Sequence, residues 1–328
     1  MAKNSILQII IASVLITLLA GCASLKPLPE GVILLRGVDP NRFESPLWSP
    51  DGSKIVGGRV WRPMPDIAGF GSRPGSEMFL VDVFTGDVQI LLKEDRSYFW
   101  PIGWTPEGQN VIINSDSSSF GSGCFELDLS EELTEPISEE LCQHGFSSDH
   151  KKSANFQWKY PYEELKLIIT DKQSGQEEVV YSISTKGVWF ANSSIPEWSP
   201  DGKKIVFSLG LQMERDNPAD TEIYIFDVET HNIERFLGDP VYFDNFPVFS
   251  PDGKFISHYF MRFAESGIER GVSVTRVDKS CQWRLPYGGG FDWSPDSTKI
   301  VVSADDGVYI VDLLEYLGES FVTGVGCP

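Results

Sequence analysis

The sequence is poor in the residues that catalytic and metal-binding proteins use most. Its 328 residues include 4 His and 5 Cys, with no Cys-x-x-Cys pair, Gly-x-Ser-x-Gly elbow or Gly-rich phosphate loop. Zinc, serine-hydrolase and phosphate-transfer chemistry are therefore disfavoured, and we expect no catalytic residue, no metal and no cofactor. We interpret the scattered His residues as solvated or hydrogen-bonded loop positions: His144, His150, His231 and His258.

Positive charge is also scarce. The chain has 27 Lys and Arg against 47 Asp and Glu, a formal net charge of −20. A nucleic-acid partner is disfavoured, because such proteins carry a basic footprint. Electrostatic docking on anionic lipid is disfavoured for the same reason, whereas a large net charge keeps a surface protein soluble and favours a monomer.

The apolar stretch from Ile6 to Ala20 has 15 residues, too few to cross a bilayer comfortably as a helix. It follows a short basic segment and has the form of a secretory signal. Its end, Leu19-Ala-Gly-Cys22, resembles the bacterial lipobox, which implies that Cys22 is lipidated and becomes the mature N-terminus. The alternatives are an ordinary signal or an uncleaved anchor.

We therefore expect an exported protein anchored by lipid in the cell envelope. Residues 1–21 form the signal peptide, 22–30 the lipidated Cys with a tether, and 31–328 the folded domain. Ala23 after the Cys favours the outer membrane in a host that has one, again by resemblance to lipoprotein sorting patterns. Whether the domain faces the periplasm or the exterior is open.

One short motif is present in five near-copies. Each has an aromatic residue, a turn of the Ser-Pro-Asp-Gly type and an apolar run, beginning at Trp48, Trp104, Trp198, Phe249 and Trp293. Pro presets the first turn position, Asp bonds its own backbone and Gly accepts positive φ, so each turn closes a hairpin. The turn carboxylates are thus interpreted as structural rather than catalytic: Asp51, Glu107, Asp201, Asp252 and Asp296.

Two further β-rich runs follow most copies, giving four strands per repeat, which is one propeller blade. The copies at Trp104 and Trp198 are 94 residues apart, about two periods. We place a degenerate copy in this gap at Phe156–Trp158, with its turn rewritten around Pro161. The sequence thus predicts an all-β fold, a six-bladed β-propeller of four-stranded antiparallel blades, with the repeat Trp residues packing between blades.

A ring of blades must be closed, because an open edge strand invites aggregation. The last copy predicts three strands, and Gly31–Gly37 is an apolar run without a blade of its own. We expect this N-terminal run to be the outer strand of blade six. The rival is the C-terminal run Ser320–Val325.

These repeats resemble those of the TolB-like six-bladed propellers, with WD40-like strand organisation, over nearly the whole mature chain. The resemblance implies the fold but little about function, because that family mixes scaffolds, binding proteins and propellers joined to peptidases. TolB itself carries an α/β domain before its propeller, which we do not expect here, so its role is not carried over.

Four Cys residues besides Cys22 suggest two disulfides in an exported chain. Three connectivities are possible. We expect Cys124 with Cys142 inside blade two, and Cys281 with Cys327 holding the C-terminal tail.

The elaborate loops lie on the side of the ring away from the repeat turns, and loops on a rigid scaffold commonly carry binding sites. They are rich in aromatics and Arg, the residue types enriched at protein-binding hot spots. Each aromatic taken singly fits blade packing equally well. The candidate ligand-binding residues are Trp61, Arg62, Arg73, Tyr98, Phe99, Trp189, Tyr242, Phe243, Arg262 and Tyr287.

Two functions from different classes fit these observations. The first is a non-catalytic, lipid-anchored binding scaffold whose loop side holds an envelope protein or peptide. The alternative is a glycan-binding or glycan-processing propeller, since aromatic residues also stack on sugars. The second lacks a convincing acid–base pair in the sequence.

Overall fold

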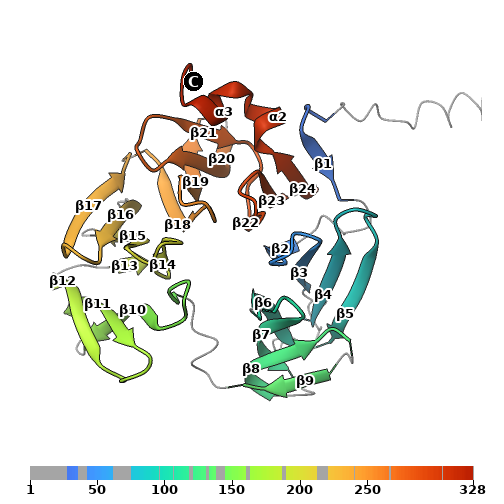
Figure 1. Cartoon of the computed structure of the whole chain (residues 1–328), viewed down its shortest axis with the longest axis horizontal. Coiled ribbons are helices and arrows are strands. Elements are labelled where there is room, and N and C mark those ends of the chain that lie inside the picture. Colours follow the sequence, from blue (N-terminus) through green and yellow to red (C-terminus); the bar gives the residue numbers. More distant parts are fainter. Residues whose placement is uncertain are drawn as a thin grey trace, which may run out of the picture.

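The computed structural model is a ring of six small antiparallel sheets around a central channel (Figure 1). It describes residues 28–327 except for 36–42, 62–74, 96, 106, 118–120, 131–132, 138–144, 160–162, 187–189, 213–220, 240, 266 and 305. The predicted six-bladed β-propeller is confirmed.

Each blade runs from an innermost strand beside the channel to an outermost strand. Blade one contains β2 (Phe43–Trp48), β3 (Lys54–Trp61), β4 (Gly75–Asp82) and β5 (Val88–Glu94). Blade two contains β6 (Tyr98–Trp104), β7 (Asn110–Ser117), β8 (Gly121–Asp128) and β9 (Leu133–Pro136). Blade three contains β10 (Lys152–Lys159), β11 (Glu164–Asp171) and β12 (Glu177–Ser184). Blade four contains β13 (Phe190–Ser193), β14 (Glu197–Trp198), β15 (Lys204–Gln212), β16 (Thr221–Asp227) and β17 (Asn232–Leu237). Blade five contains β18 (Phe243–Phe249), β19 (Phe255–Ala264), β20 (Gly267–Arg276) and β21 (Gln282–Leu285). Blade six contains β22 (Phe291–Trp293), β23 (Lys299–Ala304), β24 (Gly307–Asp312) and β1 (Val32–Leu34).

The repeat turns share one hydrogen-bond pattern. In blade one, the Ser49 hydroxyl donates to Asp51 Oδ1 at 2.7 Å and accepts the Lys54 amide at 2.9 Å, while Asp51 also accepts the Ser53 amide. Gly52 takes φ +72°, which a side chain disfavours. The same Ser–Asp bond recurs at the turns beginning with Ser199, Ser250 and Ser294. The structural interpretation of these Asp residues is confirmed.

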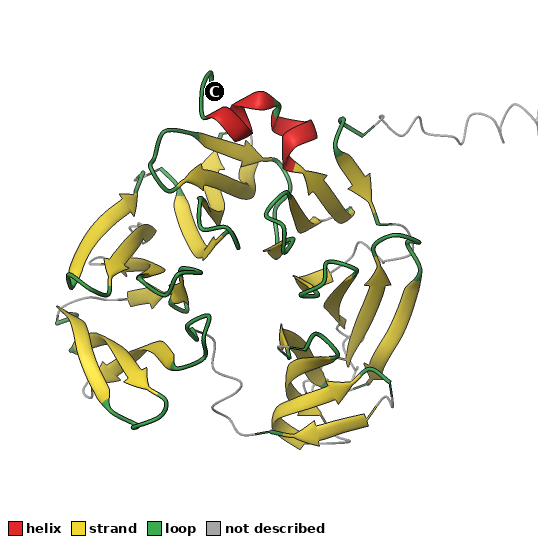
Figure 2. Cartoon of the chain, viewed as in Figure 1, coloured by secondary structure: helices red, strands yellow, loops and turns green. Residues whose placement is uncertain are grey.

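The turns surround the channel at one end of the ring, and Figure 2 shows them as loops around the central opening. We call this end the repeat-turn face, defined by residues 49–53, 147–151, 199–203, 250–254 and 294–298. The opposite end, where innermost strands begin and the links between second and third strands lie, is the loop face.

A sixth copy of the repeat, which forms blade three, was correctly predicted, but its place in the sequence was wrong. The repeat turn lies at Ser147–Lys151, where Ser147 donates to Asp149 and accepts the Lys152 amide as in the other blades. His150 takes φ +56° where most copies have Gly. Phe146 bridges to Ser153 as the innermost strand of the blade, and β10 is the second strand. Trp158 is therefore not the repeat aromatic and is partly exposed, while Pro161 lies outside the described residues.

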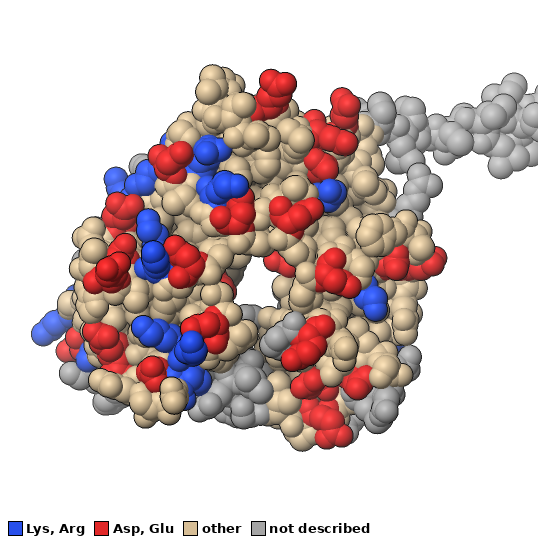
Figure 3. Space-filling model, viewed as in Figure 1, with Lys and Arg blue, Asp and Glu red and all other residues tan. Residues whose placement is uncertain are grey.

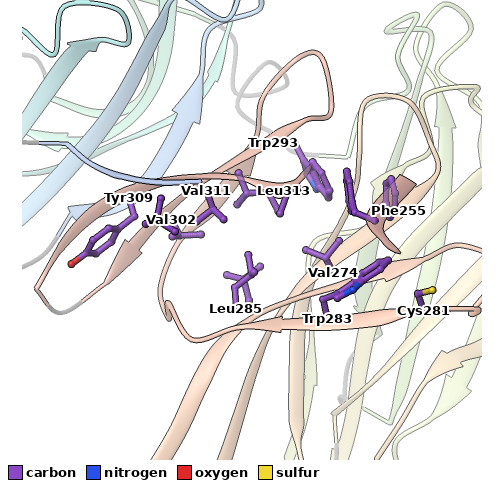
Figure 4. Packing of buried hydrophobic residues seen from close by; sticks show 14 residues of the cluster. Phe255, Val274, Cys281, Trp283, Leu285, Trp293, Val302, Tyr309, Val311 and Leu313 are labelled. Carbon is purple, nitrogen blue, oxygen red and sulfur yellow. The ribbon is translucent and has the colours of Figure 1, made fainter. Parts of the chain in front are cut away.

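Buried side chains fill the seams between neighbouring blades. Figure 4 shows the seam of blades five and six, where Phe255 and Trp283 meet Trp293 and Val311. Indole N–H groups also cross seams: Trp198 donates to the Gly145 carbonyl at 2.7 Å, and Trp293 to Ser257 Oγ at 2.7 Å. The four Trp residues at repeat positions do pack between blades, as predicted.

The N-terminal strand closes the ring, as predicted. β1 pairs antiparallel with β24, from Val32 opposite Val311 to Leu34 opposite Tyr309. The rival C-terminal run is helical instead, in α3 (Glu319–Thr323) after α2 (Leu313–Leu317), the two helices that Figure 2 draws in red.

The tail is pinned to blade five. Cys281 and Cys327 form the predicted disulfide, with Cα atoms 5.6 Å apart and a separation of 46 residues. Closing a loop of this length stabilises by about 4 kcal/mol on the chain-entropy model. Cys124 is also disulfide-bonded, but Cys142 is outside the described part of the chain.

Within the described residues, neither helix is long and apolar enough to cross a membrane. The expected signal peptide and Cys22 lie before the first described residue, Leu28.

The turn of blade three supplies a stability test. Replacing Ser147 by Ala removes a buried hydroxyl that joins Asp149 to the Lys152 amide. We expect the free energy of unfolding to fall by about 1 to 2 kcal/mol, measured by urea denaturation. Ser184→Ala, the same change at an exposed position of the same blade, should cost much less. Equal effects would argue against Ser147–Lys151 as a repeat turn.

The turns also predict a pH dependence. Hydrogen bonds from Ser49 and from Ser147 lower the pKa of Asp51 and of Asp149 from 3.8 to about 2. Because the folded-state pKa is the lower one, each carboxylate stabilises the fold above pH ~4, and this contribution is lost as the pH falls towards 2. The urea midpoint should therefore drop over this interval. Asp149→Asn should make the drop smaller, and an unchanged profile would contradict this origin.

Candidate functional site

The described part of the loop face carries a group of aromatic and Arg side chains on blade five. We name Tyr242, Phe260, Arg262 and Arg284 the Arg–aromatic cluster. Tyr242 precedes β18, Phe260 and Arg262 lie in the second half of β19, and Arg284 is near the end of β21. All four therefore lie towards the end of the blade opposite the repeat turn, which joins Phe249 to Phe255.

The rings form the floor of the cluster. Tyr242 is 8% exposed and Phe260 2%, and their rings meet edge to face with centroids 5.9 Å apart. The Arg284 guanidinium carbon lies 4.2 Å from the Tyr242 centroid and 5.6 Å from that of Phe260. Arg262 lies over the same tyrosine at 5.1 Å. Such contacts hold a guanidinium by cation–π attraction.

Local sequence explains why these side chains can meet. Gly271 pairs with Phe260 across the hairpin, and a Cβ at Gly271 would lie 2.8 Å from the phenylalanine ring. The missing side chain leaves room for that ring. Arg262 is neutralised by Glu269, its cross-strand neighbour, to which its Nη2 donates. Arg284 is exposed, and none of the described carboxylates pairs with it.

Two of the predicted site residues, Tyr242 and Arg262, are thus brought together. Phe243 begins β18 beside them, opposite Met261. Arg284 and Phe260 were not predicted, because they lie in strands rather than loops. The presence of Gly271 within a strand, opposite Phe260, is the sequence signal that could have indicated the contact.

The remaining predicted residues lie elsewhere. Phe99 is fully buried between blades one and two, so its side chain serves packing. Tyr98 is half-buried against Trp100, with ring centroids 4.5 Å apart. Tyr287 packs on Tyr309 at 4.9 Å, and burial raises its pKa. Trp61 ends β3 with only its backbone described, and three candidates lie outside the described residues: Arg62, Arg73 and Trp189.

Beneath the cluster, in the seam of blades four and five, lies a buried ionisable pair. His258 Nε2 is 3.2 Å from Asp244 Oδ1, and the two side chains are 1% and 8% exposed. The interpretation of His258 as a loop position was wrong, because it lies inside β19. Its counterparts nine residues after the repeat aromatic are apolar in other blades, such as Phe207 and Val302. Sequence alone offered no sign of its partner.

The seam continues as a polar layer toward blade four. Ser208 Oγ and Asn245 Oδ1 are hydrogen-bonded, and Ser194 Oγ accepts the Ser208 amide at 2.9 Å. The buried Thr221 hydroxyl and both ring nitrogens of His258 have no hydrogen-bond partner among the described residues, so the contact of His258 with Asp244 is a charge proximity without a well-aligned hydrogen bond. This seam is therefore more polar than its neighbours.

Two carboxyl groups lie on the innermost strands around the channel. Burial, and to a lesser extent the charge of Asp292, raises the pKa of Glu197 to about 7. Burial also raises the pKa of Asp292 to about 7, although its Oδ2 accepts the Trp48 amide at 2.7 Å. Within the described residues, no three His, Cys, Asp or Glu side chains converge as metal ligands would.

Charge is unevenly distributed around the ring. On the face seen in Figure 3, Lys and Arg gather over blades three to five, while Asp and Glu prevail over blades one and two. The same view shows the channel opening at the centre.

No protein-family model matches the chain. An uncharacterized protein of Agrobacterium fabrum is 25% identical over 254 residues, which is 74% of this chain and 78% of that protein. Solved structures with a similar fold include an oligogalacturonate lyase from Vibrio parahaemolyticus, with TM-score 0.48, 14% identity, and coverage of 86% of this chain and 93% of that one.

TolB from Acinetobacter baumannii aligns with TM-score 0.31 and 14% identity over 80% of each chain. The C-terminal WD40 domain of Sif2 aligns with TM-score 0.40 and 9% identity, over 87% of this chain and 99% of that one. At these identities the likeness concerns the fold alone, and no activity of these proteins carries over.

The buried pair can be tested by a double-mutant cycle. His258→Phe leaves Asp244 buried without its partner, and we expect the free energy of unfolding to fall by about 3 to 5 kcal/mol. Adding Asp244→Asn should recover part of this loss, because no buried charge remains. Glu229→Gln, an exposed carboxylate change, serves as the control. Strictly additive effects would show that the pair is not energetically coupled.

Proposed function

We propose that the protein is a non-catalytic binding scaffold, anchored by lipid on Cys22 in the cell envelope, and in the outer membrane of a host that has one. Its loop face binds a protein or peptide partner, and the chain acts as a monomer. The observation that carries this proposal is the Arg–aromatic cluster on the loop face.

The chemistry of the cluster fits a peptide ligand. Arg284 is exposed and held over two buried rings, so its orientation is set while its donors remain free for a backbone carbonyl or a carboxylate. A preorganised Arg loses less side-chain freedom on binding. Arg and Tyr are also the residue types that most often dominate binding energy.

Apolar surface beside the cluster supports the same proposal. Phe263 and Ile268 face each other across the tip of the β19–β20 hairpin and are 71% and 59% exposed. Because side chains alternate along a strand, this pair lies on the sheet face opposite Phe260 and Arg262, at the same end of the blade. Exposed apolar side chains at the end of the blade that carries the cluster are typical of an interaction surface.

A site-specific photo-crosslinker tests the proposal in intact cells. A benzophenone side chain at Phe263 should give a defined protein adduct. The same group at Phe84, a more exposed aromatic in the β4–β5 turn on the repeat-turn side, should not. Arg284→Ala should reduce the Phe263 adduct several-fold, because it removes the positioned donors. Arg235→Ala, which breaks an exposed ion pair in blade four, is the matched control.

An adduct at Phe263 that is insensitive to Arg284→Ala would contradict the role of the cluster. Absence of any protein adduct, together with glycan binding by residues 31–328 that Arg284→Ala abolishes, would favour the glycan alternative instead.

A further inference from the structure

The chain enters the propeller at the repeat-turn face. The Gly31 carbonyl accepts the Asp312 amide at 2.7 Å, and the next amide, that of Leu313, donates to the Thr298 carbonyl at 2.9 Å. Thr298 belongs to the repeat turn of blade six. Leu28 to Glu30, which precede Gly31, therefore lie at this end of the blade, and Figure 1 shows the start of β1 beside α2.

The entry point is held firmly. Gly31 takes φ +77°, and a Cβ there would lie 2.8 Å from the Tyr316 amide nitrogen. Any other residue would be strained in this backbone conformation and would collide with α2. The segment before Gly31 therefore leaves the ring from a fixed place.

The distance to Cys22 is short compared with the height of the ring. Five residues lie between Cys22 and Leu28, and the six chain steps from one to the other reach about 20 Å when fully extended. The 10 residues of β19, which lead from the repeat turn to the loop face, span about 30 Å. An anchor on Cys22 thus stays on the repeat-turn side of the molecule.

Apolar side chains are exposed on the tail next to this entry point. Leu314, Val322 and Val325 are 48%, 63% and 75% exposed. The tail that carries them is fixed, because Phe321 stacks on Phe255 with centroids 4.5 Å apart and Cys327 is bonded to Cys281. A fixed apolar surface beside a lipid tether is suited to the headgroup–acyl boundary of a bilayer.

We propose that the repeat-turn face at blades five and six, with α2, α3 and the tail to Cys327, lies against the lipid surface that carries the anchor. The loop face and its Arg–aromatic cluster then point away from the membrane. This inference rests on the lipidation of Cys22. The tether and apolar contacts, rather than electrostatic attraction, hold this surface against the membrane, because a net charge of −20 does not favour binding to anionic lipid.

The test uses the full lipidated protein in phosphatidylcholine vesicles that contain a headgroup nitroxide lipid. An environment-sensitive fluorophore is attached under non-reducing conditions to Val322→Cys or to Glu265→Cys, an exposed residue at the tip of the β19–β20 hairpin. We expect several-fold stronger quenching at position 322 than at position 265. Cys22→Ser proteins with the same labels give the unanchored baseline.

Equal quenching at the two positions, stronger quenching at 265, or baseline values at both would overturn this inference while leaving the anchor intact. The anchor itself is measured separately, by the mass of the N-terminal peptide and by retention on vesicles. If the N-terminal peptide of the wild-type protein carries no lipid, the proposed anchoring and this inference are both wrong. The proposed binding role of the loop face would not be affected.

Discussion

The propeller depends on one small arrangement, a buried hydroxyl at the start of each repeat turn, which comes from Ser in five blades and from Thr105 in blade two. In blade six, Ser294 donates to Asp296 at 2.6 Å and accepts the Lys299 amide at 2.9 Å, so the hydroxyl joins both strands of the hairpin. The hydroxyl is shielded from water, so losing either bond would leave a buried polar group unsatisfied. This fixes where each innermost strand ends and the second begins, and hence which side chains enter the seams.

The seams convert this local order into a closed ring. Where strand alternation places apolar residues at a seam, the seam is filled by a hydrophobic cluster, such as the one around Phe207 between blades three and four. The seam of blades four and five departs from this rule, because Asp244, His258 and Asn245 replace apolar positions with a polar network. This network is only partly satisfied, because both ring nitrogens of His258 and the Thr221 hydroxyl have no hydrogen-bond partner among the described residues. It lies directly beneath the Arg–aromatic cluster.

Turn chemistry made the fold predictable, because Ser, Pro, Asp and Gly each have a direct effect on the backbone. The period and the unpaired run Gly31–Gly37 then predicted the closed ring. The repeat turn of blade three was predicted in the wrong place because Phe146-Ser-Ser-Asp-His150 keeps the aromatic, Ser147 and Asp149 of the motif but lacks its Pro and Gly. Ser147 and Asp149 are the ones that make the hydrogen bonds, so they were the more informative signal.

The site was less predictable than the fold for a physical reason. Arg284 meets Tyr242 only because β21 and the link before β18 converge in space, and no local pattern encodes that contact. Composition suggested Tyr242 and Arg262, which the structure brings together, although Arg262 lies in β19 and not in the expected loop. It could not distinguish them from Phe99, whose burial depends on the neighbouring blade.

The closing strand joins the ring to the segment that carries the proposed anchor. β1 has three residues paired with β24, and Leu35 adds a hydrogen bond to the Val308 carbonyl. The same strand completes blade six and is the first folded segment after the proposed anchor. The packing of α2 against Gly31 adds a second set of contacts at that point. Val32 of the same strand is buried in the seam of blades five and six, so the entry of the chain is joined to that seam directly.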